Sequence, residues 1–296
     1  MARSRLFPAL IVAPALLLGA CSGGDDSTAT TVAPTTTRVA EPGAFPADPV
    51  DVTFASADGA QLQGKYYPAA ANPAPLVVLY HWEMGDMEDW YEVANWLQNR
   101  GTHNQIPTFS HTPFLDGRWF PAMPAAPTYN VFIATFQGCS PHPDGCPNWT
   151  PDKWLADAQG MLQQASGMPG VDADRIITIG AGIGADAAVD ACSWWNDTHP
   201  AGCDGAFTLS PGSYLGKSFG GTVAGLGDGS PVVPVWCVTD GRLQSGLCDA
   251  PGVEDNSAYR KVDVDGATPG AGLLVPEADP NPLDLLIEFL ALTVPM

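Results

Sequence analysis

Nucleophilic catalysis needs a Ser or Cys close to a histidine base, and this chain has only five histidines, none of them beyond His199. Ser210 and Ser213 follow a strand-like apolar run, but no histidine is expected near them. Asp240 follows another such run and is a candidate acid. A lone carboxylate in a loop is more often a turn former or a solvated charge. The residue types therefore offer an acid without an evident nucleophile or base.

A second group of chemistry-bearing residues lies in one short segment and has the types that ligate metals: His81, Glu83, Asp86, Glu88 and Asp89. Their spacing matches neither H-E-x-x-H nor a comparable ligand pattern. The acids stand directly before a helical pattern, where negative side chains offset the positive end of the helix. We therefore predict no metal site and no cofactor.

Seven cysteines divide into Cys21 and three pairs of near neighbours, namely Cys139 with Cys146, Cys192 with Cys203, and Cys237 with Cys248. Local disulfides are the natural interpretation in an oxidising compartment. The connectivity rests on proximity alone, because six thiols allow many pairings. Zinc is less favoured, since the chain has no C-x-x-C and no pair has a well-spaced histidine.

The charge balance excludes some classes of partner. Lys and Arg number 12 against 32 Asp and Glu, a formal charge of −20, while 45% of the residues are hydrophobic. From Phe45 onward, 9 basic residues (12 − 3) and 29 acidic ones (32 − 3) still give −20. We predict a sizeable apolar core and no nucleic-acid partner. Adhesion of the folded part to anionic headgroups is equally disfavoured.

The elements that must position these residues alternate between strands and helices. Strands are expected at 50–54, 61–67, 76–80, 130–135, 175–179, 206–209, 232–238 and 260–264. Helices are expected at 89–100, from Thr150 (as N-cap) to 165, at 183–194 and at 283–290. This alternation predicts an α/β fold with a mostly parallel sheet and helices on both faces, preceded by a hairpin at Asp58-Gly59. An insertion at about 102–129 breaks the rhythm and is either a lid or binding loop or a segment packed on the domain surface.

The strand expected at 175–179 runs into Gly180-Ala181-Gly182-Ile183-Gly184 and then a helix. This resembles the nucleophile elbow of the α/β-hydrolases, in the dienelactone-hydrolase-like or esterase-like branch. The resemblance extends over about 50–292 and includes Leu209-Ser210-Pro211. It implies an α/β-hydrolase-like fold.

The same resemblance implies a catalytic triad, two members of which are missing here. Gly182 stands at the serine position of G-x-S-x-G and has no side chain that could attack a carbonyl. Pro269, in Thr268–Leu274, stands where the family has its histidine, and Asp240 matches the acid. His81-Trp82 replaces the family's His-Gly before the oxyanion loop, so Trp82 is expected to crowd the cleft. The candidate cleft residues are therefore His81, Trp82 and Ile183.

The N-terminus has the pattern of an export signal. Arg3 and Arg5 precede a short apolar run that ends in Leu18-Gly19-Ala20-Cys21, which resembles a bacterial lipobox. Residues 1–20 would be the signal peptide, and Cys21 would carry the lipid. Residues 21–48, rich in Thr, Ala, Pro and Gly, would form a tether to the domain at 49–296. Ordinary secretion with a chance cysteine is the alternative.

Together these observations predict an exported protein, lipid-anchored to the outer face of the bacterial membrane, with a non-catalytic hydrolase-like domain. Its role would be binding or structural at the cell envelope, with any small-molecule or envelope ligand in the former active-site cleft. The membrane would be contacted only through the lipid. The alternative function is an active ester or lactone hydrolase with an unrecognised nucleophile.

Overall fold

The computed structural model describes residues 45–100, 119–124, 128–139, 146–241 and 245–295. The expected signal peptide, the cysteine expected to carry a lipid (Cys21) and all but the last residues of the expected tether lie outside these ranges. So does most of the expected insertion. In the part that is described, no helix is both long and apolar enough to cross a bilayer.

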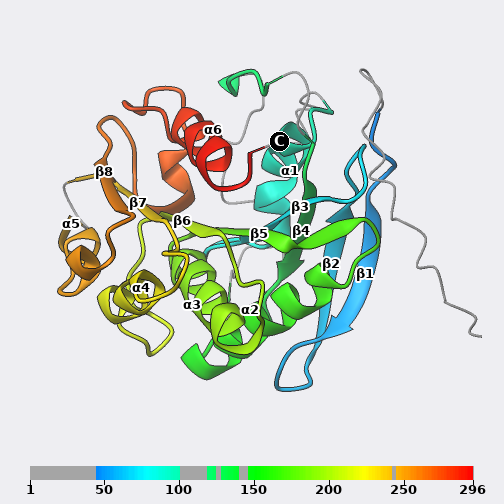
Figure 1. Ribbon diagram of the computed structural model, residues 1–296, viewed down its shortest axis with the longest axis horizontal. Helices are drawn as coiled ribbons and strands as arrows, with labels where there is room; N and C mark the ends of the chain where they lie inside the picture. The colour runs from blue at the N-terminus through cyan, green and yellow to red at the C-terminus, as the bar shows by residue number, and fades with distance from the viewer. Residues whose placement is uncertain (1–44, 101–118, 125–127, 140–145, 242–244, 296) are drawn as a thin grey trace, which may run out of the picture. The chain divides into compact units, whose positions relative to one another are not determined.

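Eight strands form one sheet in the order β1-β2-β4-β3-β5-β6-β7-β8 (Figure 1). They are β1 (Val50–Ala55), β2 (Gln61–Tyr67), β3 (Ala74–Tyr80), β4 (Asn130–Thr135), β5 (Val171–Ala181), β6 (Gly205–Leu209), β7 (Val235–Thr239) and β8 (Tyr259–Asp263). β2 pairs antiparallel with β1 and with β4, and every other neighbour pair is parallel. The predicted N-terminal hairpin and the mostly parallel sheet are confirmed.

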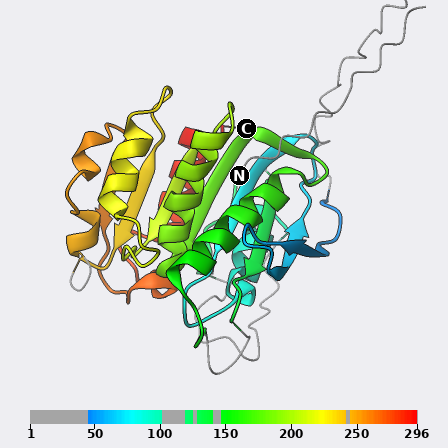
Figure 2. The same ribbon diagram turned by 90° about the horizontal axis from the view of Figure 1, so that it is seen from below.

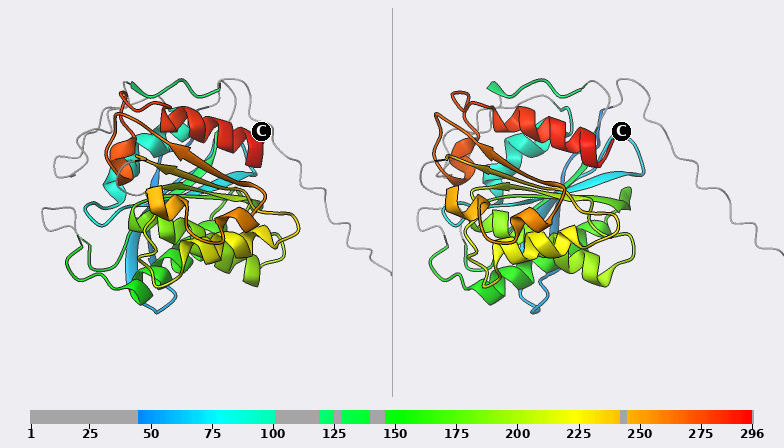
Figure 3. Two further views of the ribbon diagram at one scale, coloured as in Figure 1. Left: turned by 90° about the vertical axis from the view of Figure 1, so that its left-hand side faces the viewer. Right: turned by 60° about the vertical axis from the view of Figure 1, so that its left-hand side comes forward.

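Helices cover both faces of the sheet, as Figure 3 shows with the sheet seen nearly edge-on. One face carries α2 (Pro151–Ser166), α3 (Ile183–Thr198) and α4 (Phe219–Gly227), which lie side by side in Figure 2. The other face carries α1 (Tyr91–Leu97), the short 3-10 helix η4 (Gly270–Leu273) and α6 (Pro282–Thr293). Two further short helices, α5 (Ser245–Cys248) and η3 (Val253–Asp255), lie between β7 and β8 in the sequence.

Two apolar cores follow from this layering, because a buried strand sends alternate side chains to opposite faces. In β3, Leu76, Val78 and Tyr80 join the core under α2 and α3. Val77 and Leu79 join the core under α1 and α6. All seven residues of β3 are buried, which explains why the strand reads as a continuous apolar run.

Several element boundaries differ from the expectation. The helix expected at 89–100 begins two residues earlier as a 3-10 turn, η1 (Met87–Trp90), and the side chain of its N-cap, Asp86, accepts the Glu88 N–H. The α-helix ends at Leu97, and Asn99 takes a left-handed conformation with φ 55°. Residues 232–234 are not part of β7, and Pro234 has no N–H to give to a ladder. Thr150 is the N-cap of α2 by position, but its side chain makes no capping hydrogen bond.

All three predicted disulfides are confirmed: Cys139–Cys146, Cys192–Cys203 and Cys237–Cys248. Each closes a short loop, the separations being 7, 11 and 11 residues. The described end of the expected insertion packs on α1. There the Trp96 indole N–H donates to the carbonyl of Pro121 at 2.7 Å and its ring lies 5.9 Å from that of Phe120.

Candidate functional site

The turn between β5 and α3 is a sharp elbow centred on Gly182. Its backbone has φ 57° and ψ −121°, a conformation that side-chain-bearing residues adopt only under strain. The Gly182 N–H donates to the Leu209 carbonyl at 2.8 Å, which ties the elbow to the end of β6. Gly184 is equally constrained, because a β-carbon there would lie 2.2 Å from the Tyr80 carbonyl oxygen. The chain therefore forms a sharp strand-to-helix elbow that has a glycine, Gly182, at its central position.

The space above Gly182 belongs to two residues that follow β3. A β-carbon built on Gly182 would lie 3.1 Å from Glu83 Oε2 and 3.4 Å from the β-carbon of Trp82. Glu83 Oε2 is buried and has no hydrogen-bond partner among the residues that the structure describes. A carboxylate thus stands where the side chain of an elbow nucleophile would point. Sequence reasoning weighed Glu83 only as a metal ligand, and its neighbour Trp82 in the loop after β3 was the one signal that could have placed it here.

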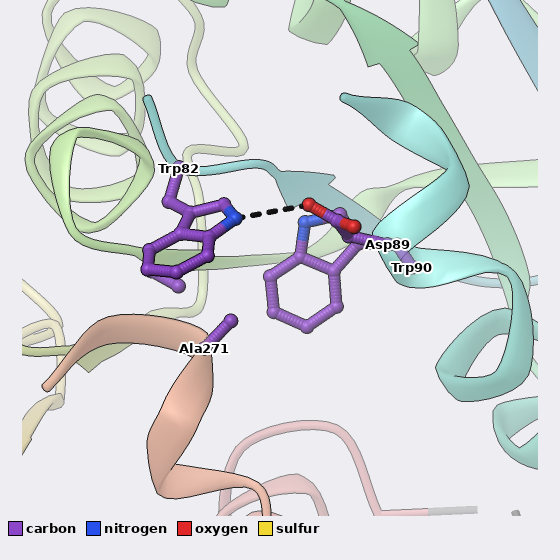
Figure 4. A pocket seen from close by; sticks show the side chains of 5 residues that line it. Trp82, Asp89, Trp90 and Ala271 are labelled. Atoms are coloured by element: carbon purple, nitrogen blue, oxygen red, sulfur yellow. Dashed lines mark hydrogen bonds between the residues drawn. The ribbon is translucent and has the colours of Figure 1, made fainter. Parts of the chain in front are cut away.

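Trp82 fills the region between the elbow and the loop expected to carry the family histidine (Figure 4). A β-carbon on Gly270, the residue after Pro269, would lie 3.1 Å from Trp82 Cε3. The Trp82 indole N–H donates to Asp89 Oδ2 at 3.0 Å, which fixes the ring. The gap lined by Trp82, Asp89, Trp90, Ala181 and Ala271 leaves no room for a water molecule. The structure therefore places the indole of Trp82 between Gly182 and the 269–270 turn.

His81 makes contacts that suit a structural histidine. One ring nitrogen, Nε2, accepts the Phe136 N–H at 3.0 Å, so Nδ1 carries the proton and donates to the Trp82 carbonyl at 2.7 Å. Burial lowers the pKa of His81 to about 4, and its ring packs against Phe136 and Trp154. With both nitrogens engaged, His81 has neither a free base nor a free ligand atom. Both aromatic neighbours of the ring, Phe136 and Trp154, belong to the core under α2 and α3.

His81 is also close to a disulfide. Its ring nitrogen and the sulfurs of Cys139 and Cys146 lie within 4.8 Å of one another, the separation that a metal site would need. The two sulfurs are bonded to each other, and thiolates rather than disulfide sulfurs bind metals. This cluster therefore does not form a metal site in the disulfide-bonded protein.

The other predicted positions lie as follows. Asp240 comes directly after β7 and is buried, at 5% exposure. Ile183 opens α3 and is buried in the core under that helix. Asp86 and Asp89 are buried at η1, where burial raises the pKa of Asp86 to about 6. The side chain of Asp86 caps η1 by accepting the Glu88 N–H at 2.8 Å.

The loop after β6 carries the two serines that the sequence offered as candidate nucleophiles, and it begins beside the elbow, where the Gly182 N–H donates to the Leu209 carbonyl. Ser210 and Ser213 have left-handed backbones, with φ 55° and 56°. Ser210 is 1% exposed, and its hydroxyl has no hydrogen-bond partner in the described part of the chain. Asp186, in the first turn of α3, holds the loop by accepting the N–H groups of Gly212 at 3.1 Å and Tyr214 at 2.6 Å. Burial raises the pKa of Asp186 to about 7.

A larger cavity, of about 330 Å³, lies at the opposite edge of the sheet. Its walls come from the end of α3, the loops before β6 and β7, and the end of α6, including His199, Asp204, Pro231 and Leu292. His199 stacks on Trp195 with 3.4 Å between ring centroids. This cavity shares no residue with the elbow.

Solved structures with the same architecture decide the fold. An esterase of Pyrococcus furiosus superposes with a TM-score of 0.55 and 14% identity over 83% of this chain and 91% of its own. The thermostable carboxylesterase EstE1, cloned from a metagenomic library, gives 0.55 and 14% over 84% and 90%. The chain has the α/β-hydrolase fold. DcsB, solved with its substrate analogue, gives 0.55 and 14% over 83% and 99%.

Similarity in sequence does not extend as far. No protein-family model and no curated protein matches the chain at a significant level. In the α/β-hydrolase fold the carboxyl ends of β5, β6 and β7 lie at one edge of the sheet, and here that edge carries Gly182, Ser210 and Asp240. The fold therefore identifies the elbow as the position of a possible active site. Whether this site can catalyse a reaction depends on its own residues and not on the fold.

Proposed function

We propose that this is an exported, lipid-anchored protein whose hydrolase-fold domain is non-catalytic and has a binding or structural role at the cell envelope. The observation that carries the proposal is the elbow itself. Gly182 has φ 57° and no side chain, and Glu83 and Trp82 occupy the space above it. A triad needs a nucleophile within hydrogen-bond reach of an imidazole. Here residue 182 offers no nucleophile, and no histidine follows His199.

The anchor and the location rest on the N-terminal pattern. Cys21 is proposed to carry the lipid, with residues 1–20 removed and the following Thr-, Ala-, Pro- and Gly-rich residues as a tether. Three disulfides in the domain support an oxidising compartment. The acidity of the chain from Phe45 onward, 9 − 29 = −20, favours a domain that is repelled by anionic lipid and wall polymers.

Any ligand of this domain is proposed to bind at the carboxyl ends of the strands, where Trp82 now fills the cleft. Ligands of open α/β sheets bind at this edge. Because the gap beside Trp82 admits no water, entry of a ligand requires the indole to move. Glu83, which faces the elbow, would then be the first polar group that the ligand meets.

A second candidate function is favoured by one observation, the two unpartnered oxygens beside the elbow. Glu83 Oε2 and Ser210 Oγ are both buried and find no hydrogen-bond partner among the described residues. Ser210 also has a left-handed backbone of the kind found at functional sites. An ester or lactone hydrolase could use Ser210 as nucleophile or Glu83 as a base for water. Such an enzyme would work without an imidazole.

The two candidate functions predict different results in a covalent-labelling experiment. Purified protein treated with a serine-directed phosphonate is expected to keep its intact mass, because the elbow has no activated hydroxyl. A stoichiometric adduct on Ser210, lost in Ser210→Ala, would overturn the non-catalytic proposal in favour of the hydrolase.

The anchor is tested separately in cells. Wild-type protein is expected in the membrane fraction and in the detergent phase of a detergent partition, whereas Cys21→Ala should be soluble or remain unprocessed. If Cys21→Ala partitions as the wild type does, the lipobox interpretation is wrong.

A further inference from the structure

The cavity beside His199, at the amino ends of β6 and β7, is large enough for a small molecule. Its volume of about 330 Å³ lies in the range of pockets that hold small ligands. At roughly 30 Å³ for each water molecule, it has room for about eleven of them, which is close to the space that one sugar ring occupies. All of its lining residues lie outside the elbow. It is therefore a separate candidate site.

Covalent and hydrogen bonds hold the walls of this cavity in place. The disulfide Cys192–Cys203 joins α3 to the loop before β6. The side-chain oxygen of Asn196, in α3, accepts the Cys203 N–H. Asp204 exchanges two hydrogen bonds with Ile176, since it donates its N–H to the Ile176 carbonyl and accepts the Ile176 N–H with Oδ2, each at 2.7 Å. A ligand therefore meets a largely preformed wall, which lowers the entropic cost of binding.

His199 contributes an acceptor nitrogen to this wall. The Thr198 hydroxyl donates its proton to the Trp194 carbonyl at 2.8 Å. In the 2.9 Å contact between Thr198 Oγ1 and His199 Nδ1, the imidazole is therefore the donor. With the proton of the neutral ring on Nδ1, Nε2 is an acceptor. Stacking on Trp195, with 3.4 Å between the ring centroids, fixes the orientation of the ring.

Four residues of the wall carry a polar side-chain atom that no described residue binds. They are Asp204 with Oδ1, His199 with Nε2, Asn196 with its amide nitrogen and Ser230 with its hydroxyl. None of these atoms is among the described polar atoms that lack a partner and are also shut off from solvent. They are therefore open to a ligand, to which they offer two acceptors, one N–H donor group and one hydroxyl that does both.

The charges of the wall favour a neutral ligand. Among the described residues, no Lys or Arg lines the cavity, so an anion would meet the Asp204 carboxylate without a counter-charge. An ammonium ion would pair with Asp204 but would leave the Asn196 N–H group without an acceptor. Hydroxyl groups both donate and accept, so a ligand with several hydroxyls satisfies the acceptors and the donor together.

The rest of the wall is apolar. Pro200, Pro231 and Pro234 line the cavity, and prolines have no N–H to donate. Leu292, at the end of α6, also lines it and is 62% exposed. A sugar ring has hydroxyls on its edge and C–H groups on its faces. It therefore matches a wall that combines a few polar atoms with apolar surface.

We propose that this cavity binds one ring of a neutral sugar. Asp204 and His199 accept hydrogen bonds from the sugar hydroxyls, and Asn196 donates one. Ser230 does either, and Leu292 packs on the C–H groups of the ring. The site is additional to the cleft above the elbow and needs no catalytic residue.

The test is an NMR titration of the full-length protein with four probes that share a six-membered ring, namely methyl glucoside, glucuronate, protonated glucosamine and cyclohexanol. Methyl glucoside is expected to bind with a Kd on the order of 1 mM, as suits a ligand of about a dozen non-hydrogen atoms. Glucuronate should bind at least about tenfold more weakly, because its carboxylate meets that of Asp204. Glucosamine should bind no more tightly than methyl glucoside. Cyclohexanol, with its single hydroxyl, should show no binding.

Two variants change the polar wall and keep the bonds that hold it. Asp204→Asn retains an oxygen for the Ile176 N–H, and Asn196→Asp retains one for the Cys203 N–H. Each is expected to weaken the binding of methyl glucoside at least about fivefold. Asp255→Asn makes the same change at an exposed residue of η3 that does not line the cavity. This control should leave the binding unchanged.

Several results would overturn the inference. Methyl glucoside could fail to bind up to about 20 mM, well above the expected Kd, or glucuronate or cyclohexanol could bind as tightly as it does. Tighter binding of glucosamine would show a site for cations instead. Wild-type affinity in both Asp204→Asn and Asn196→Asp would place the sugar elsewhere. Ester turnover by the elbow bears only on the proposed function, because the cavity and the elbow share no residue.

Discussion

Gly182→Ser restores the residue type that the elbow of an active hydrolase carries, and we expect it to destabilise the domain without creating an enzyme. The backbone at Gly182 has φ 57°, which costs a residue with a side chain about 1–3 kcal/mol. The new β-carbon would lie 3.1 Å from Glu83 Oε2, close enough that this side chain must shift. For a domain of this size, about 1 kcal/mol corresponds to about 2–4 °C in Tm. We therefore expect Tm to fall by roughly 2–12 °C.

Two controls isolate the cause. Gly182→Ala has the same backbone strain without the hydroxyl, so its loss of stability should match that of the serine variant. Gly225→Ala lies in α4, where an added β-carbon meets nothing within 4 Å. It should leave stability unchanged or raise it by about 0.5–1 kcal/mol.

The assay is calorimetric unfolding together with hydrolysis of an activated ester. Without an imidazole beside residue 182, the serine hydroxyl has no general base, and its rate should not exceed that of Gly182→Ala. A serine variant as stable as the wild type would refute the strain argument. A serine variant that becomes a competent esterase would refute the account of the missing histidine.

Three further predictions concern stability. Burial raises the pKa values of Asp86, Asp157, Asp190 and Asp204 to about 6 and that of Asp186 to about 7. The folded state therefore binds these protons more tightly than the unfolded chain, and stability should rise as pH falls from 8 to about 5.5. Protonation of unfolded His81, whose folded pKa is lowered to about 4, opposes this below about pH 6.5. A Tm that is lower at pH 5.5 than at pH 8 would contradict the prediction that the five aspartates outweigh His81. Asp186→Asn should flatten this pH dependence, and an unchanged pH profile in this variant would show that Asp186 does not titrate as described. Trp82→Ala should lower the free energy of unfolding, measured with denaturant, by about 3 kcal/mol, because it empties the space between the elbow and the 269–270 turn. Trp82→Phe should lower it less. Equal losses in the two variants would show that the indole does not fill that space.

The layered fold was predictable because its signals are local. Continuous apolar runs such as the one in β3 indicated strands buried on both faces, and Gly180-Ala181-Gly182 marked the turn from β5 into α3. The disulfides were predictable from proximity, since each closes a short loop. The short helices of the second half were not predicted. α4, for example, is a nine-residue helix with four glycines, and its stability depends on packing by residues such as Phe219 and Val223.

The site was predictable in part. The sequence indicated that residue 182 has no nucleophile and that Trp82 is bulky. It did not indicate that Glu83 would face the elbow, because the path of a loop after a strand depends on tertiary contacts such as the bond from Trp82 to Asp89. The left-handed backbone of Ser210 could not be foreseen either, since the loop that follows Ser210 is held by Asp186 of α3, a residue distant in sequence. Such contacts join residues that are distant in sequence and leave no periodic pattern.

The central claim is that the elbow does not catalyse ester hydrolysis, and the most direct measurement is kcat/KM for an activated ester with purified wild-type protein beside Trp82→Ala and Asp240→Asn. The account predicts that all three give the same rate as the buffer blank. Measurable turnover by the wild type that disappears in the Trp82 or Asp240 variant would contradict it.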